Sequence, residues 1–172
     1  YQHCNVASKA EVDAALAATL AAFGRVDGLV NNAGIFRAAP FLDISEADWD
    51  AVIDVNLKGH FLVGQAVARQ IVAQGDRGAI VNMSSVNARL TIASIASYNA
   101  SKGGVDQLTR VMALALSEHG IRVNGVKAIG TASAFADFLH MGVFFRPGAK
   151  GDQIIYGVCP ANLKGITIVC RE

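Results

Sequence analysis

Over the first 126 positions, stretches with apolar residues at helical spacing are separated by short runs of apolar residues. The first pattern is typical of amphipathic helices and the second of buried strands. Ser8 and Glu11 form a Ser-x-x-Glu capping pattern, and Gly24 stands where a helix that begins there would end. The apolar residues between them recur at helical spacing: Val12, Leu16, Leu20 and Phe23. The pattern predicts one helix here, preceded at residues 1–6 by the end of an extended segment.

Two longer helices are predicted farther along the chain. Ser45 and Asp48 repeat the capping pattern before the first of them, and Gly75 and Gly120 mark their ends. These helices cover about residues 46–74 and 98–118. Short apolar runs predict strands at about 28–32, 79–83 and 121–126, and two further short strands at 154–156 and 166–169.

Strands and helices therefore alternate, which is the pattern of an α/β protein with a doubly wound parallel sheet. The character of the chain changes after residue 126, where helical periodicity weakens. Residues 127–172 hold four of the eight phenylalanines: Phe135, Phe138, Phe144 and Phe145. We expect an organised region at 1–126 and an atypical tail at 127–172.

Composition narrows the classes of protein that fit. The 172 residues are 52% hydrophobic and 17% charged, which excludes a disordered chain. The net charge of +1 gives no basic surplus for a nucleic-acid partner, and no apolar stretch is long enough to predict a membrane span. Three scattered cysteines predict neither a disulfide framework nor a metal site, so we expect a reduced, cytoplasmic protein.

Tyr98 and Lys102 are the first candidates for chemistry. Residues four apart on a helix share a face, so these two side chains are expected to lie close together. A phenol ordinarily titrates near pH ~10, and a neighbouring ammonium lowers its pKa. The pair can therefore serve as a general acid and base near neutral pH.

Other polar residues fall where ligands bind in parallel sheets. Ser84 and Ser85 follow the apolar run at 79–83, and the Asn31-Asn32-Ala33-Gly34 segment follows the preceding strand. The carboxyl ends of parallel strands form the ligand-binding edge of such sheets. Asn56 lies inside a predicted helix, where Asn is a poor helix former unless its amide has a hydrogen-bonding task.

Together, the segment at 31–34, Asn56, Ser85 and the Tyr98-x-x-x-Lys102 pair resemble the short-chain dehydrogenase/reductase family. Ser85 stands 13 residues before Tyr98, a spacing that resembles the family's and favours it over Ser84. The resemblance covers about residues 1–126. It implies a Rossmann-like sheet and hydride transfer between NAD or NADP and a small alcohol or ketone.

The resemblance also implies roles for particular residues. Tyr98 would be the general acid and base, Lys102 would lower its pKa and bind the nicotinamide ribose, and Ser85 would orient the substrate oxygen. Asn56 would hold a water in a proton relay. The other expected cofactor contacts are Asn5, Val6, Asn32, Ala33 and Gly34. The helices at 46–74 and 98–118 would form a homo-oligomer contact.

The chain departs from the family's pattern at both ends. The Gly-rich phosphate motif Thr-Gly-x-x-x-Gly-x-Gly is absent, and Asn5-Val6 stands where the family has Asp-Val. The residue that separates NAD from NADP would precede residue 1, so the choice stays open. After Asn124 the usual Pro-Gly is missing, which a shift of reading frame or a rearrangement would explain.

Strand order gives these departures a structural meaning. In the order 3-2-1-4-5-6, loss of the first two strands leaves residues 1–6 without a neighbour and the strand at 28–32 with an unpaired edge. We therefore expect a partial Rossmann-like sheet, in a fragment that does not fold stably alone. Two alternatives to an active oxidoreductase remain: a non-catalytic remnant that acts as an interaction module, and a sugar-nucleotide epimerase or dehydratase.

Overall fold

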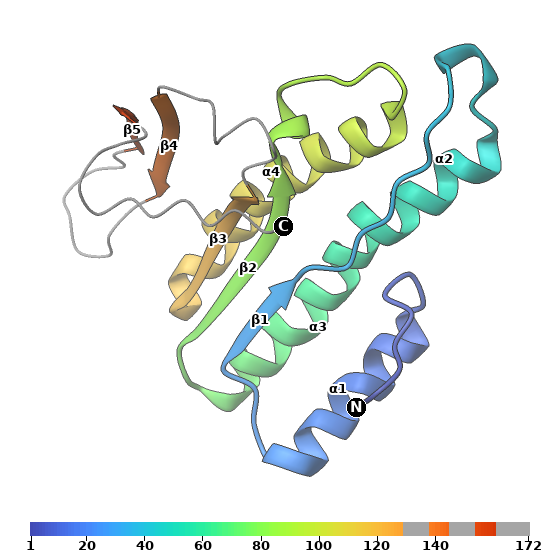
Figure 1. Ribbon diagram of the computed structural model, residues 1–172. Helices are drawn as coiled ribbons and strands as arrows, with labels where there is room; N and C mark the ends of the chain where they lie inside the picture. The colour runs from blue at the N-terminus through green and yellow to red at the C-terminus, as the bar shows by residue number, and fades with distance from the viewer. Residues whose placement is uncertain (129–137, 145–153, 161–172) are drawn as a thin grey trace. The chain divides into compact units, whose positions relative to one another are not determined.

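The computed structural model describes residues 1–128, 138–144 and 154–160 (Figure 1). The chain divides into two compact units, Tyr1–Ala128 and Ile129–Glu172. The helices of the first unit are α1 (Lys9–Phe23), α2 (Glu46–Ile53), α3 (Gly59–Gln74) and α4 (Ala96–Leu116). Its strands are β1 (Gly28–Asn31), β2 (Gly78–Ser85) and β3 (Ile121–Ala128), and a π-helical turn, η2, covers Asp54–Lys58.

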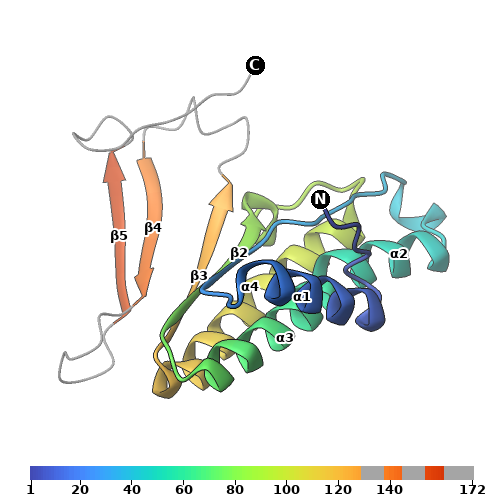
Figure 2. The same cartoon turned by 90° about the horizontal axis from the view of Figure 1, so that it is seen from below.

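The three strands form one parallel sheet in the order β1-β2-β3 (Figures 1 and 2). Leu29 lies opposite Ile80, which lies opposite Val123 on the next strand. The segment α2-η2-α3 connects β1 to β2, and α4 connects β2 to β3, because parallel neighbours need a crossover connection. The predicted α/β class is confirmed, and β1 is an edge strand in the described sheet.

The core lies between this sheet and the helices on one of its faces (Figure 2). Ile80 and Val123 point into the core, where Ile71 of α3 and Met112 of α4 meet them. Val30 of β1 points to the opposite face, and 64% of its surface is exposed. One face of the sheet is therefore packed, whereas at Val30 the other is open to solvent.

The predicted caps are confirmed. Ser8 Oγ accepts a hydrogen bond from the backbone N–H of Glu11 at the start of α1, and Ser45 Oγ accepts one from Asp48 at the start of α2. Gly24 ends α1 with φ of 75°, in the left-handed region that favours glycine. Local sequence therefore determines where these helices begin and end.

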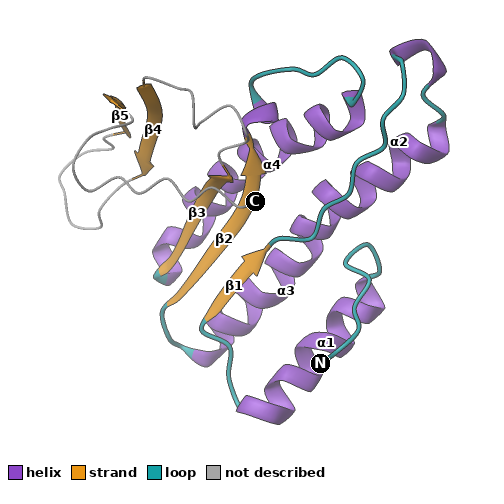
Figure 3. Ribbon diagram, in the orientation of Figure 1, coloured by secondary structure: helices purple, strands orange, loops and turns teal. Residues whose placement is uncertain are grey.

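The helix predicted at 46–74 is confirmed as one continuous helical stretch, in which the π-helical turn η2 stands between α2 and α3 (Figure 3). The π-helical turn contains Asn56, whose amide bonds outside the helix hold it in place. Gly59 follows, where a Cβ would come 2.7 Å from Val6 Cγ2. The interruption reflects tertiary contacts of this turn rather than a weak helical pattern.

Two boundaries also differ from the expectation. β2 runs on through Ser84 and Ser85, and α4 begins at Ala96, two residues before Tyr98. The strand-like segment predicted at 1–6 is not in a sheet. The side chain of Asn5 accepts a hydrogen bond from the backbone N–H of Ala7 and so forms a turn there.

The second unit contains an antiparallel pair, β4 (Phe138–Phe144) and β5 (Ile154–Pro160). β5 confirms the strand predicted at 154–156 and extends it. β4 was not predicted, because His140 and Gly142 break the apolar run that contains them. The strand predicted at 166–169 lies outside the described residues.

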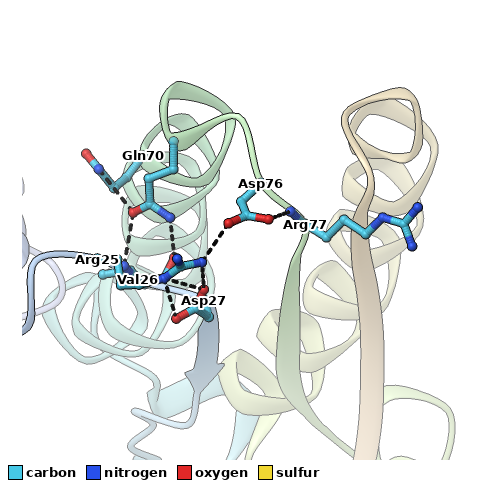
Figure 4. Close-up of polar contacts among 7 residues, drawn as sticks. Arg25, Val26, Asp27, Gln70, Asp76 and Arg77 are labelled. Carbon is cyan, nitrogen blue, oxygen red and sulfur yellow. Dashed lines mark hydrogen bonds and ion pairs between the residues drawn. The ribbon is translucent and has the colours of Figure 1, made fainter.

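The amino end of the sheet is tied by polar groups at the surface (Figure 4). The guanidinium of Arg25, before β1, pairs with Asp27 and with Asp76, which precedes β2. The side-chain amide of Gln74 makes two bonds to the backbone of Val26: it accepts from the N–H at 3.0 Å and donates to the carbonyl at 2.9 Å. These contacts fix the turn that precedes β1 against the end of α3.

Candidate active site

A pocket of about 270 Å³ opens at the carboxyl end of the sheet. The segment after β1, the end of β2 and the first turns of α4 form its walls. The lining residues are Asn32, Gly34, Ile35, Phe36, Met83, Ser84, Tyr98 and Lys102. The structure thus brings together four of the residues that the sequence assigned to catalysis or cofactor binding: Asn32, Gly34, Tyr98 and Lys102.

Tyr98 and Lys102 lie on the same face of α4. The ammonium nitrogen of Lys102 is 5.7 Å from the centroid of the Tyr98 ring and donates a 2.7 Å hydrogen bond to the carbonyl of Met83. Lys102 is only 4% exposed, and this burial lowers the pKa of its ammonium. A cation held beside a phenol at the pocket wall can stabilise the phenolate and so ease proton transfer.

Asn56 is completely buried beneath the pocket, and its amide makes a two-pronged contact with Ile35. Its Oδ1 accepts from the Ile35 N–H and its Nδ2 donates to the Ile35 carbonyl, both at 2.8 Å. Nδ2 also donates to Ser101 Oγ, whose hydroxyl donates to the carbonyl of Tyr98. Asn56 therefore joins the segment after β1 to the start of α4.

The two serines at the end of β2 have different partners. Ser84 lines the pocket, but its hydroxyl donates to Asp106 on α4 at 2.5 Å. Ser85, which is buried, does not line the pocket; its hydroxyl donates to Asn87 Oδ1 and accepts from the Asn87 N–H. Successive residues of a strand point to opposite faces, which accounts for the separation of the two hydroxyls.

The remaining predicted cofactor residues lie away from the pocket lining. Asn5 and Val6 belong to the turn before α1, and Val6 packs against Gly59 at the start of α3. Ala33 is half-buried on the segment between Asn32 and Gly34. The structure does not place these three residues in the walls of the pocket.

His60 is a buried group that no motif in the sequence connects with the site. Only 2% of it is exposed, and its Nε2 has no hydrogen-bond partner. The ring lies against the backbones of Asn31 and Met83, near Lys102. Burial, followed by the charge of Lys102, lowers its pKa from 6.5 to about 4. His60 lies in the middle of the helical pattern at 46–74, and no spacing in the sequence distinguishes a buried histidine there from an exposed one.

A buried amide network lies next to His60. Asn31 Nδ2 donates to Asn82 Oδ1 at 2.9 Å and to the carbonyl of His60. Asn82 Nδ2 donates to Thr109 Oγ1 on α4 at 3.0 Å. Asn31 is thus a structural link between β1, β2 and α3.

The fold and pocket together define a class of protein: an α/β protein with a parallel sheet and a Tyr-x-x-x-Lys pair at the carboxyl end of that sheet. The chain matches the short chain dehydrogenase family over residues 1–140 and belongs to that family. The match extends past residue 126, where the recognisable motifs end.

Individual relatives support this assignment. D-threitol dehydrogenase of Mycolicibacterium smegmatis is 44% identical over 151 residues, which cover 88% of this chain and 55% of that protein. Gluconate 5-dehydrogenase of Gluconobacter oxydans is 47% identical over 103 residues, which cover 60% of this chain and 40% of that protein.

Solved structures agree. A gluconate 5-dehydrogenase from Burkholderia cenocepacia, in complex with NADP and tartrate, superposes with a TM-score of 0.68 at 45% identity. The match covers 71% of this chain and 48% of that one. The chain therefore spans about half the length of the relatives that it matches.

The described residues hold no group of three His, Cys, Asp or Glu side chains suited to a metal ion. Among the helices that the structure describes, none is long and apolar enough to cross a membrane.

Proposed function

We propose that this chain carries the proton-transfer site of an NAD(P)-dependent oxidoreductase that interconverts a secondary alcohol and a ketone. The observation that carries the proposal is the buried ammonium of Lys102 beside Tyr98 in the wall of a pocket at the carboxyl end of the sheet. Membership of the short chain dehydrogenase family supports the same reaction class.

The residues of the pocket fit part of a nicotinamide cofactor. A Cβ at Gly34 would lie 3.5 Å from Asn56 Oδ1 and 3.8 Å from Lys102 Nζ, so glycine leaves free the space beside the lysine. Lys102 has donors left to bind ribose hydroxyls after its one bond to Met83. When bound, the cofactor would exchange a hydride with the substrate. NAD and NADP both fit this proposal.

Each residue of the site has a distinct proposed task. Tyr98 exchanges a proton with the substrate oxygen, and Lys102 favours the phenolate form of Tyr98. Ser85 orients the substrate oxygen, for which its hydroxyl must turn away from Asn87. Asn56 acts through position, because its amide already holds Ile35 and Ser101.

The cofactor contacts extend from the pocket toward the start of the chain. We assign Asn32, Ala33 and Gly34 to the ribose, and Asn5 and Val6 to the adenine. The side-chain oxygen of Asn5 already accepts a hydrogen bond from the Ala7 N–H. Its amide nitrogen is therefore the group that would donate a hydrogen bond to the adenine base.

The decisive experiment substitutes Tyr98→Phe and measures both turnover and cofactor binding. Turnover of a secondary alcohol should fall by at least about a thousandfold, since the proton donor is lost, while NADH and NADPH fluorescence titrations should change little. Tyr1→Phe is the matched control, because Tyr1 is fully exposed. Retained turnover in Tyr98→Phe would contradict the assignment.

The second candidate is an interaction module without catalysis, which an apolar groove between α3 and α4 favours. The groove has a volume of about 520 Å³ and includes Phe61, Val111 and Met112. Phe61 and Val111 are exposed. We propose that a second copy of the chain binds here, in a cytoplasmic homo-oligomer.

Sedimentation tests whether the groove binds a second copy, and cofactor titration separates the two candidates. Val111→Asp should shift the chain to a monomer at concentrations where the wild type associates, and Lys9→Asp on the exposed surface of α1 is the control. An interaction module would self-associate and show no NADH or NADPH binding at millimolar concentration. An oxidoreductase would bind at least one of the two cofactors.

A further inference from the structure

The pocket has an aromatic side chain beside its catalytic pair. Phe36 lines the pocket with Tyr98, and 62% of Phe36 is exposed. Leu90 and Ile92, on the segment between β2 and α4, are 64% and 50% exposed. Single exposed apolar side chains are common at protein surfaces, but an aromatic side chain in the wall of a pocket offers an apolar surface to a ligand.

Hydrogen bonds hold the two segments that carry these side chains. The N–H of Ala39 donates to the carbonyl of Ser94 at 2.9 Å and so joins the segment after Phe36 to the segment before α4. Asn87 Nδ2 donates to the Leu90 carbonyl, and Asn99 Nδ2 donates to the Ile92 carbonyl at 2.8 Å. These bonds fix the backbone at Leu90 and Ile92 before any ligand binds.

The polar side chains nearby have protein partners. The amide of Asn87 is used at both ends, by the Ser85 hydroxyl and the Leu90 carbonyl. The Ser84 hydroxyl is bound to Asp106, and Arg37, next to Phe36, pairs with Asp48 at 3.5 Å. Among the described residues, the exception is the buried Asn99 Oδ1, an acceptor without a partner. The Asn87 amide and the Ser84 hydroxyl are therefore not free for substrate hydroxyls.

We infer that the substrate carries an aromatic or aliphatic group next to its reacting carbon, and that Phe36 selects it by packing against that group. This inference rests on the proposed function. It separates this chain from the two relatives named for D-threitol and gluconate, which are a polyol and a polyhydroxy acid. A hydroxyl-rich chain would lose water at Phe36 without replacing its hydrogen bonds, and an apolar group would gain from the same burial.

The test uses 4-phenyl-2-butanone and 5-keto-D-gluconate as probes. Its first part measures binding and does not depend on turnover. Saturation-transfer NMR should show the phenyl ketone, and not the keto acid, bound to the chain. Phe36→Ser should reduce the ketone signal at least fivefold. Phe41→Ser is the matched control, since Phe41 is exposed and lies outside the pocket lining. Circular dichroism of Phe36→Ser should match the wild type.

The second part measures reduction of both probes with NADH and NADPH. We expect kcat/KM at least tenfold higher for the phenyl ketone, with that preference lost in Phe36→Ser. Ketone binding that depends on Phe36 without turnover of either probe would contradict the proposed function and leave the inference intact. Binding or turnover that favours the keto acid, or no binding of the ketone, would overturn the inference.

Discussion

The two ends of α3 are held in the same way but in different surroundings. Asn56, just before α3, and Gln74, its last residue, each make a two-pronged amide contact with one backbone residue. Their partners, Ile35 and Val26, flank β1. The side chain of Asn56 is completely buried at the active-site end, and Ile35 is half-buried. The side chain of Gln74 is half-buried beside the exposed ion pairs of Arg25.

This difference predicts that the side chains most important for stability lie at the active-site end of the sheet. At the carboxyl end, desolvated amides and one buried cation, Lys102, fix the geometry of the pocket, and any unpaired group there is costly. At the amino end, water can replace the Arg25 ion pairs with little loss. Substitutions at the two ends should therefore lower the free energy of unfolding by different amounts. The losses should also depend differently on salt and on pH.

The largest effect is expected from Asn56→Ala. The substitution removes the partners of the half-buried Ile35 N–H and carbonyl, removes the buried bond to Ser101 Oγ and opens a cavity where the Asn56 side chain was. Together these losses should cost about 3 kcal/mol of unfolding free energy. Urea unfolding measures it. Asn32→Ala, the same substitution at an exposed position of the neighbouring segment, should change stability little. Equal losses of unfolding free energy in Asn56→Ala and Asn32→Ala would show that the burial of Asn56 adds nothing to its contribution to stability.

Low pH should reduce the stability of the folded chain through His60, which lies near the carboxyl end of the sheet. Its pKa is lowered from 6.5 to about 4 in the folded chain, so the unfolded chain binds the proton first as the pH falls. Stability is lost between pH 6.5 and about 4, by about 3 kcal/mol from this group. His60→Phe should flatten that part of the urea-midpoint profile.

His119→Gln, at an exposed position near the end of α4, is the matched control for His60→Phe. A pH profile of His60→Phe that overlays the wild type between pH 4 and 6.5 would rule out the buried neutral imidazole.

At the amino end, the largest expected loss comes from Gln74→Ala. The two bonds to Val26 are half-buried, so water can partly replace them, and the cost should be about 1–2 kcal/mol. Thermal unfolding compares it with Gln107→Ala, an exposed glutamine on α4. A loss as large as that of Asn56→Ala would remove the contrast between the two ends.

The smallest effect is expected from Arg25→Met. The guanidinium and its two carboxylate partners are all exposed, and the pairing with Arg25 lowers the pKa of Asp76. The Tm should fall by less than in Gln74→Ala, and the difference from wild type should shrink in 1 M NaCl, because salt screens exposed charges. A difference that persists in 1 M NaCl would mean that Arg25 stabilises by packing.

Much of the site follows from sequence because its signals are local. Tyr98 and Lys102 are four residues apart on one helix, which alone places both on the same face. Gly34 follows a strand, at the ligand-binding edge of a parallel sheet. Ser85 was chosen by its spacing from Tyr98, and the structure buries it against Asn87, so its role stays a prediction.

The rest depends on contacts between segments far apart in the sequence. The helical pattern of 46–74 is continuous, yet the turn at Asn56 is π-helical where its amide reaches Ile35 and Ser101. Phe36 has no motif that marks it, and only the fold places it beside Tyr98. Pattern-based reasoning has no access to such pairings.

The sequence by itself determined the helix caps and the Tyr98–Lys102 pair, since each depends on residues within one or two turns of a helix. The alternation of strands and helices along the chain determined that the sheet is parallel. Tertiary structure alone decided which polar groups are buried. It left the Nε2 of His60 without a partner, placed the hydroxyl of Ser84 on Asp106 and made Phe36 a wall of the pocket. The physical reason is that burial and hydrogen-bond pairing arise only when distant segments pack together.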